Sequence, residues 1–105
     1  MAFQDLNWAR WSGDGNLYFV TLLGVSGNTV SVRYYDGTEE DVDKKNTFNL
    51  VEALNAGLFP HGNWQGQGGF YLCEILKLGE NSVLVKYEDG VEENMPYEWL
   101  VFLRR

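Results

Sequence analysis

The sequence repeats once, and this repeat constrains the fold more than any other feature of the chain. Residues of the first copy return 53 positions further on without a gap: Trp11 as Trp64, Tyr18 as Tyr71, and the segment 28–40 as 81–93. The shared features are turn glycines, alternating valines followed by an aromatic residue, and a closing acidic cluster. The 105-residue chain is therefore expected to contain two copies of one small unit, so its fold and function are interpreted copy by copy.

Each copy has the hydrophobic pattern of short antiparallel strands. In segment 30–35, two valines and Tyr34 alternate with more polar residues, so one face of the strand is expected in the core and the other in water. Asp36-Gly37 is typical of a two-residue hairpin turn, and the acidic segment 38–42 is expected to return beside the valine strand. A five-strand unit of this size can close as a barrel, which also removes exposed sheet edges.

The segment between the copies departs from the strand pattern. Asn49 followed by Glu52 resembles a capping box, and the apolar residues beyond it have near-helical spacing, which predicts a short helix over about 49–57. An alternative makes residues 48–51 a fifth strand, because they align with residues 101–103 of the second copy. Both assignments stay open at this stage.

The two prolines predict local features of the second copy. Pro60 lies in a weak entry strand over residues 59–64, and it is expected to confine that strand to a sheet edge. Pro96 suits the first position of a helix, so one helical turn is expected over residues 96–99.

The overall composition excludes several classes of function. The net charge is −7 and both copies are acidic, so neither provides the lysine and arginine field that phosphate binding requires. A basic partner is therefore favoured over a nucleic acid. No run approaches the roughly 18 apolar residues of a membrane span, and the N-terminus shows no basic segment followed by an apolar one, so an intracellular location is expected.

Metal binding and catalysis are not expected either. Cys73 is the only cysteine and His61 the only histidine, so neither an internal disulfide nor a four-ligand zinc site can form. Cys73 has apolar neighbours and is expected in the core, whereas His61 is expected at a turn or an interface. No catalytic triad, separated carboxylate pair or metal set is visible, which predicts a non-catalytic protein without a cofactor.

Both copies resemble the Tudor and agenet branch of the SH3-like barrels, which read methylated lysine or arginine. The ordered features are an aromatic residue, a short glycine and acid loop, a tyrosine one strand later, a Val-x-Val-x-Tyr strand, Asp-Gly and Glu-Glu. The resemblance covers about residues 6–50 and 59–103, which is nearly the whole chain. It implies an all-β fold of two tandem five-stranded barrels, one over residues 1–48 and one over 59–105, joined by a helical linker over 49–58.

The resemblance further implies an aromatic cage at one end of each barrel. By position, the expected cage residues are Trp11, Tyr18, Tyr34 and Asp36 in the first copy, and Trp64, Tyr71, Tyr87 and Asp89 in the second. A methylated ammonium keeps its charge but loses hydrogen-bond donors, so aromatic faces suit it better than carboxylates alone. The implied ligand is a methylated side chain of a basic, histone-like protein tail, in the nucleus if the host is a eukaryote.

Other interpretations of the same residues stay open. Tyr34 and Tyr87 continue the valine face, so an alternative assigns them to capping the core. Phe19 and Leu72 stand where many relatives have proline, which indicates contact between barrels or a homodimer, and hence an assembly module without methyl specificity. Tyr35 is a candidate fourth aromatic residue in the first copy. The acidic runs after each Asp-Gly turn are expected to be solvated edge-strand charges that block strand addition.

Overall fold

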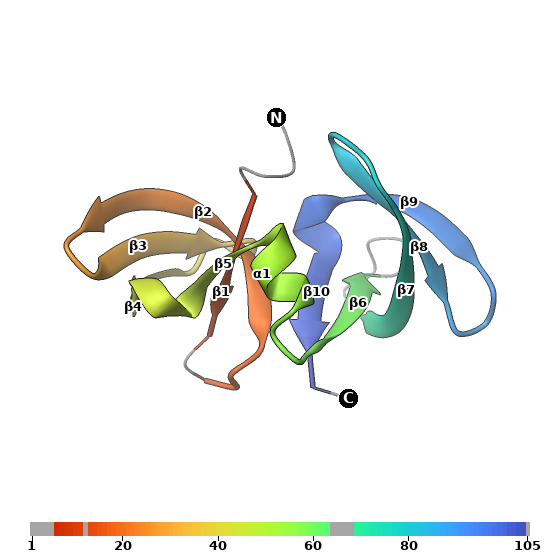
Figure 1. The fold of residues 1–105 in the computed structure, drawn as a ribbon, viewed down its shortest axis with the longest axis horizontal. Coiled ribbons are helices and arrows are strands. Elements are labelled where there is room, and N and C mark those ends of the chain that lie inside the picture. The colour runs from red at the N-terminus through yellow and green to blue at the C-terminus, as the bar shows by residue number, and fades with distance from the viewer. Residues whose placement is uncertain (1–5, 12, 64–68, 105) are drawn as a thin grey trace.

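The structure, a computed structural model, describes residues 6–11, 13–63 and 69–104, and most of its regular structure is antiparallel strand (Figure 1). The strands are β1 Asn7–Arg10, β2 Leu17–Ser26, β3 Thr29–Tyr34, β4 Glu39–Asp43, β5 Thr47–Asn49, β6 Phe59–Asn63, β7 Phe70–Leu78, β8 Ser82–Tyr87, β9 Glu92–Pro96 and β10 Leu100–Leu103. The helical segments are α1 Leu50–Leu54 and two 3-10 turns, Lys44–Asn46 and Tyr97–Trp99. None of the helices in the described ranges has the length and hydrophobicity of a membrane span. The all-β class predicted from the sequence is confirmed.

The two copies of the repeat have the same strand pairing. In the first half (residues 6–58), β1 pairs with both β2 and β5, and β2, β3 and β4 follow as a meander. In the second half (residues 59–104), β6 pairs with both β7 and β10, and β7, β8 and β9 form the same meander. The long strands β2 and β7 are interrupted at equivalent places, where the register skips Leu23 and Leu76. Such bulges bend a strand, so the two halves share this bend as well as their strand pairing.

The Asp-Gly segments form hairpins, but with a longer loop than the two-residue turn predicted from the sequence. The backbone N–H of Tyr34 donates to Thr38 O at 2.7 Å, and that of Gly37 donates to Tyr34 O at 2.9 Å, so the loop covers residues 35–37. Gly37 has a φ of +92°, which glycine adopts at little cost. A loop of this length ending in a left-handed glycine is a common alternative to the two-residue turn, and it carries Asp36.

The halves lie side by side along the longest dimension of a molecule measuring 44 × 28 × 25 Å (Figure 1). The strand order is β4-β3-β2-β10-β6-β7-β8-β9, with β10 pairing along β6 and meeting β2 where Phe102 faces Leu17. The prediction that Pro60 confines its strand to an edge is wrong, because β6 lies between β10 and β7. Pro60 is tolerated there because pairing with β7 begins only at His61.

Among the residues that the structure describes, the buried side chains form two clusters, and the larger one crosses the boundary between the halves. The smaller cluster belongs to the first half alone and contains Ala9, Val20, Val30, Val32, Tyr34 and Val42. The larger cluster combines most of the second half's core with Leu6, Trp8, Leu17, Leu50 and Ala53 of the first. Trp8 is fully buried, with edge contacts to Phe19, Tyr97 and Phe102, and its Nε1 donates to Leu100 O at 2.7 Å. The copies therefore support each other, which suits units of this small size.

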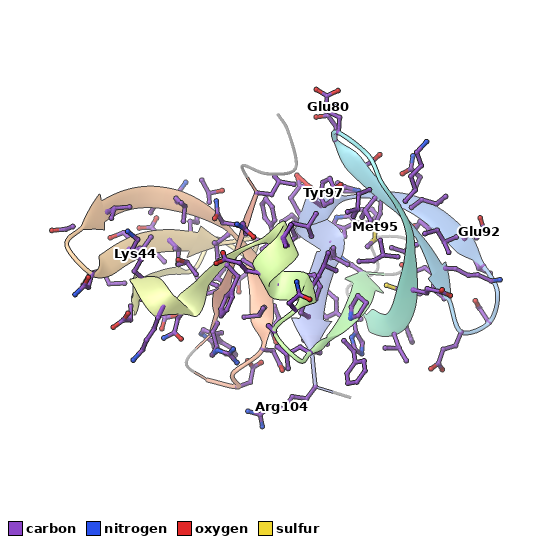
Figure 2. All side chains as sticks on the ribbon, in the orientation of Figure 1. Lys44, Glu80, Glu92, Met95, Tyr97 and Arg104 are labelled. Carbon is purple, nitrogen blue, oxygen red and sulfur yellow. The ribbon has the colours of Figure 1, made fainter. Side chains whose placement is uncertain are left out.

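Most of the buried residues described in the second half are apolar, with Asn63 as a buried polar residue. Met95 and Tyr97 lie in its interior, whereas Glu80 and Glu92 point away from it (Figure 2). Cys73 is buried in the same cluster, which confirms its predicted place in the core. Burial raises the pKa of the Cys73 thiol to about 12, so the thiol stays protonated and weakly nucleophilic at neutral pH.

The segment between the halves contains both elements that the sequence allowed. The Asn49 side chain accepts the N–H of Glu52 at 2.8 Å, and the Glu52 carboxylate accepts the N–H of Asn49 at 2.9 Å, which confirms the predicted capping box. Strand β5 ends at Asn49, and α1 ends at Leu54, before the predicted residue 57. The helix stops early because the Asn55 N–H donates to Glu52 O at 3.1 Å, which tightens the last turn.

Candidate functional site

The loop after β1 is shaped so that the Trp11 ring lies against it. The Trp11 carbonyl accepts the N–H of Gly15 at 2.9 Å, and the Trp11 N–H donates to Asn16 O at 3.0 Å. A Cβ at Gly13 would lie 3.1–3.2 Å from carbons of the Trp11 ring, so glycine allows this close approach. Asp14 Oδ1 accepts the N–H of Asn16 at 2.8 Å, a local turn typical of aspartate. The glycine and acid loop thus holds an exposed indole beside the start of β2.

Three rings of the first half stand in a row from the core to the surface. The Trp11 and Tyr18 centroids are 6.2 Å apart at 83°, and those of Tyr18 and Tyr34 are 6.5 Å apart at 78°. These are edge contacts, which aromatic pairs prefer over face-to-face stacking. The exposed fraction is 7% for Tyr34 and 42% for Trp11. The three predicted rings therefore meet, and Tyr34 also belongs to the core cluster of the first half.

The hydroxyls of the two tyrosines donate to carboxylates. Tyr18 Oη donates to Asp14 Oδ2 at 2.6 Å, and Tyr34 Oη donates to Glu40 Oε2 at 3.0 Å. Burial, together with the hydrogen bond to Asp14, raises the pKa of Tyr18 to about 12, and burial with the hydrogen bond to Glu40 also raises the pKa of Tyr34. Both phenols are therefore neutral near pH 7. Donation to a carboxylate gives each phenol partial phenolate character, which raises the electron density of the ring and makes its face more attractive to a cation.

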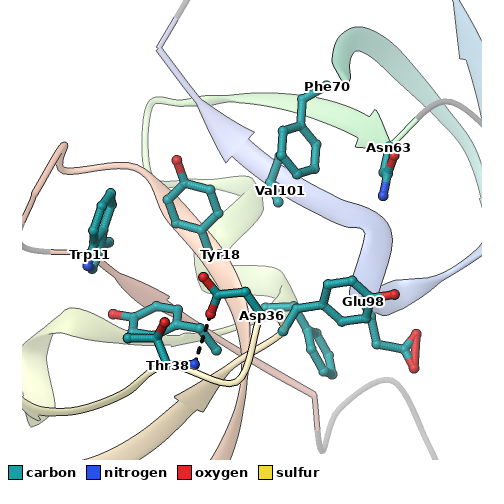
Figure 3. A pocket seen from close by; sticks show the side chains of 11 residues that line it. Trp11, Tyr18, Asp36, Thr38, Asn63, Phe70, Glu98 and Val101 are labelled. Carbon is teal, nitrogen blue, oxygen red and sulfur yellow. Dashed lines mark hydrogen bonds between the residues drawn. The ribbon is translucent and has the colours of Figure 1, made fainter. Parts of the chain in front are cut away.

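A cavity of about 250 Å³ opens beside this row of rings (Figure 3). Its lining comes from both halves: Trp11, Tyr18, Phe19, Tyr34, Tyr35, Asp36 and Thr38 from the first, and Asn63, Phe70, Glu98 and Val101 from the second. The Asp36 carboxylate accepts the N–H of Thr38 at 2.9 Å, and hydrogen bonding to Thr38 lowers the pKa of Asp36. Asp36 is therefore charged at neutral pH. Aromatic walls with two carboxylates, Asp36 and Glu98, suit an organic cation.

The equivalent end of the second half is built differently. Tyr87 is buried and donates to Glu93 Oε1 at 2.8 Å, as Tyr34 does to its own glutamate, whereas Tyr71 is 56% exposed. A hollow of about 360 Å³ there is lined by Tyr71, Leu72, Tyr87, Glu88 and Asp89. The predicted cage residue Trp64 lies outside the described residues. The structure thus brings Tyr71, Tyr87 and Asp89 to one hollow, with a glutamate where the first half has Tyr35.

Sequence reasoning missed the lining residues that the second half contributes to the first cavity. The sequence does offer a sign of Phe70 as a lining residue, because it is aromatic where the first copy has Leu17. Asn63, Glu98 and Val101 carried none, since the position of one half against the other is not encoded in a local motif. Tyr35, the candidate fourth ring, lines the cavity and is 62% exposed.

In the part of the chain that the structure describes, no group of three or more histidine, cysteine, aspartate or glutamate side chains could hold a metal ion. His61 lies within strand β6 rather than in a turn, and its Nδ1 is 2.8 Å from Phe59 O. Comparison of the chain with protein-family models, curated proteins and solved structures finds no significant match.

Proposed function

We propose that the chain is a non-catalytic binding module that takes up a methylated lysine or arginine side chain of a basic, histone-like protein tail. We further propose that its halves are SH3-like barrels of the Tudor and agenet type. Five strands in each half, with the first strand pairing with both the second and the fifth, support the barrel assignment. A nuclear location in a eukaryotic host belongs to the same proposal.

One observation carries the ligand assignment. Trp11, Tyr18 and Tyr34 stand in edge contact along one cavity, and the charged carboxylate of Asp36 lines the same cavity. A methylated ammonium or guanidinium spreads a positive charge over an apolar surface, so it gains from ring faces and from a nearby carboxylate together. A neutral apolar side chain gains only from the rings, and an unmethylated lysine stays better hydrated.

The expected affinity is weak. Each accessible ring contributes roughly 0.5–2 kcal/mol by cation–π attraction, and Tyr34 contributes least because it is only 7% exposed. Ordering a flexible peptide offsets part of this gain, which leaves dissociation constants on the order of micromolar. Added salt should weaken binding moderately, since the net charge of −7 attracts basic peptides over long range.

Calorimetric titration with short basic peptides tests the proposal. Each peptide contains one lysine or arginine, either unmodified or methylated, and a further peptide carries acetyl-lysine as a neutral analogue. We expect binding of a methylated peptide with a dissociation constant on the order of micromolar, and at least roughly tenfold weaker binding of the unmodified one. Trp11→Ala should weaken the methylated complex about tenfold, because it removes an exposed indole that lines the cavity and contacts Tyr18.

Leu22→Ala provides the matched control. Leu22 is also 42% exposed and lies in the first half, but it lines neither cavity. Its replacement should leave the affinity within about twofold of wild type. Equal binding of methylated and unmodified peptides, or equal losses in the Trp11 and Leu22 variants, would contradict the proposed function.

The exposed face of α1 supports a second candidate, an assembly module without methyl specificity. Val51 and Leu54 are exposed there, whereas Leu50 and Ala53 of the same helix are buried. The sequence suggested Phe19 and Leu72 for a homodimer. Both side chains are half-buried and therefore less exposed than Val51 and Leu54, and Phe19 packs against Trp8. Light scattering at several concentrations tests this candidate, because a stable dimer that Val51→Asp converts to a monomer would favour it.

A further inference from the structure

We infer that the two halves build one composite binding site, in which Phe70 and Glu98 of the second half contact the ligand held by the rings of the first. This inference rests on the proposed function, because it assigns further ligand-contacting residues to the same cavity. It departs from the expectation of one complete cage in each half. It predicts one methylated side chain bound per chain.

Exposed rings from both halves converge on this cavity. Trp11 and Tyr35 of the first half are 42% and 62% exposed, Phe70 of the second half is 41% exposed, and all three line the cavity. Figure 3 shows Trp11 at one side of the cavity and Phe70 with Val101 at another. Single exposed apolar residues are ordinary on a protein surface, but rings that gather at one hollow indicate a ligand site.

The second half contributes to the cavity at positions where it departs from the repeat. Phe70 takes the place of Leu17, which is fully buried in the first half. Glu98 takes the place of Lys45, so a carboxylate lines the cavity where a faithful repeat would have put an ammonium group. A lysine there would repel a cationic ligand, whereas a glutamate attracts it.

Contacts across the boundary hold these walls at fixed positions before any ligand arrives. They are the hydrogen bonds from Trp8 Nε1 to Leu100 O at 2.7 Å, from Arg104 N to Asn16 Oδ1 at 3.1 Å and from Trp99 Nε1 to Tyr35 Oη at 3.4 Å, and the pairing of Phe102 with Leu17. Two of these contacts involve lining elements directly, since Tyr35 lines the cavity and Asn16 belongs to the Trp11 loop. A site whose walls are already placed loses little conformational entropy on binding.

The second-half wall also defines the chemical class of ligand. Phe70 and Val101 add apolar surface, and Glu98 adds a negative charge, so the composite site favours an alkylated cation over a neutral side chain of similar size. A peptide with trimethyl-lysine should therefore bind better than the same peptide with acetyl-lysine. Replacing Glu98 by glutamine should reduce this preference while leaving the apolar wall in place.

Titration of the full chain with the trimethyl-lysine, dimethylarginine and acetyl-lysine peptides tests the inference. Phe70→Ala and Glu98→Gln should each weaken binding of the better methylated peptide about three- to tenfold. Glu98→Gln should also narrow the ratio of trimethyl-lysine to acetyl-lysine affinity, an effect that a change in folding would not produce.

Two second-half variants serve as controls, because Leu76 is 42% exposed and Glu80 is exposed, and neither residue lines the cavity. Leu76→Ala and Glu80→Gln should bind within about twofold of wild type.

The outcomes separate this inference from the proposed function. If Trp11→Ala removes methyl-dependent binding but Phe70→Ala and Glu98→Gln bind like their controls, the composite site is wrong and the first-half cage stands. Two equivalent ligands per chain would also overturn the composite site. If the wild-type chain binds no methylated peptide better than its unmodified form, the proposed function fails and the inference fails with it. Thermal unfolding of each variant verifies that its fold is retained, and Phe70→Tyr, which keeps the ring, should retain binding.

Discussion

The two halves share their strand pairing, their bulges and their hairpin turns, but they differ in what fills them. The first half has a small core of its own and gives Trp8 to the larger core of its neighbour. At the position of Trp8 the second half has His61, which is only partly buried. The backbone repeat therefore fixes the topology, while unequal side chains at equivalent positions create the junction between the halves and the cavity beside it.

Replacing Trp8 should have the largest effect on stability, because this residue belongs to the core that the two halves share. Trp8→Ala removes three edge contacts and the hydrogen bond to Leu100 O, so we expect a loss of about 3–5 kcal/mol in the free energy of unfolding. This is a large part of the stability of a small protein, so both halves should unfold together. His61→Ala, at the equivalent position, should cost less than about 1 kcal/mol. Urea denaturation followed by fluorescence and by circular dichroism measures both, and separate transitions for the two halves would contradict a shared core.

How far the sequence predicts this structure depends on whether a feature is local. The alternation around Tyr34, the Asp-Gly hairpin and the capping box at Asn49 are each set by neighbouring residues, and all three appear as strand, turn and helix start. The rings of Trp11, Tyr18 and Tyr34 meet because they lie at the end of β1, in β2 and at the end of β3, which pair as two successive hairpins.

Features that depend on the junction could not be predicted in this way. Pro60 by itself predicts an edge strand, because nothing in the neighbouring sequence indicates that β10 returns beside it. Glu98 reaches the cavity only because the second half packs at one particular position against the first. Side-chain packing at the junction decides both, and it involves residues far apart in the chain, such as Trp8 and Leu100.

A second difference between the halves concerns a compensated pair of core residues. The first half has buried Ala9 with Val42, whereas the second has Gly62 with Met95 at the equivalent positions. A Cβ at Gly62 would lie 2.5 Å from Tyr87 Oη and 3.2 Å from Met95 Sδ and Cε. Gly62→Ala should therefore lower the free energy of unfolding by about 1–3 kcal/mol through overpacking.

The first half indicates how that damage can be relieved. Adding Met95→Val to Gly62→Ala recreates the combination present in the first half. The double variant should therefore lose less free energy of unfolding than the sum of the losses of the two single variants. Ala9→Gly is the reverse change, and it should cost roughly 0.5–1 kcal/mol through backbone entropy and lost packing. Urea unfolding midpoints measure all of these. Strict additivity of Gly62→Ala and Met95→Val would contradict the compensation.

Alkaline pH should destabilise both halves through their hydrogen-bonded tyrosines. The folded state raises the pKa of Tyr18 from 10.0 to about 12, and it also raises the pKa values of Tyr34 and Tyr87. Between pH 10 and 12 the unfolded chain loses phenol protons that the folded chain retains, so the stability present below pH 10 falls as pH rises. Thermal unfolding in steps of pH, with tyrosinate absorbance as the second signal, measures this fall. Tyr18→Phe should make it shallower, and an unchanged slope in that variant would exclude Tyr18 as a source.

The smallest expected effect gives the sharpest comparison, because it uses the same change at the same position of each half. Tyr34→Phe and Tyr87→Phe each remove a hydroxyl that donates to a glutamate, at 3.0 and 2.8 Å, so both should lower the free energy of unfolding by a similar amount of about 0.5–1.5 kcal/mol. Only Tyr34→Phe should also weaken methylated peptide binding, about two- to threefold, because its ring lines the composite cavity and loses the polarisation from Glu40. Denaturation and peptide titration of the two variants separate stability from binding. If Tyr87→Phe weakened binding as much as Tyr34→Phe, the second hollow would have to hold ligand as well, and the halves would be alike in function as they are in topology.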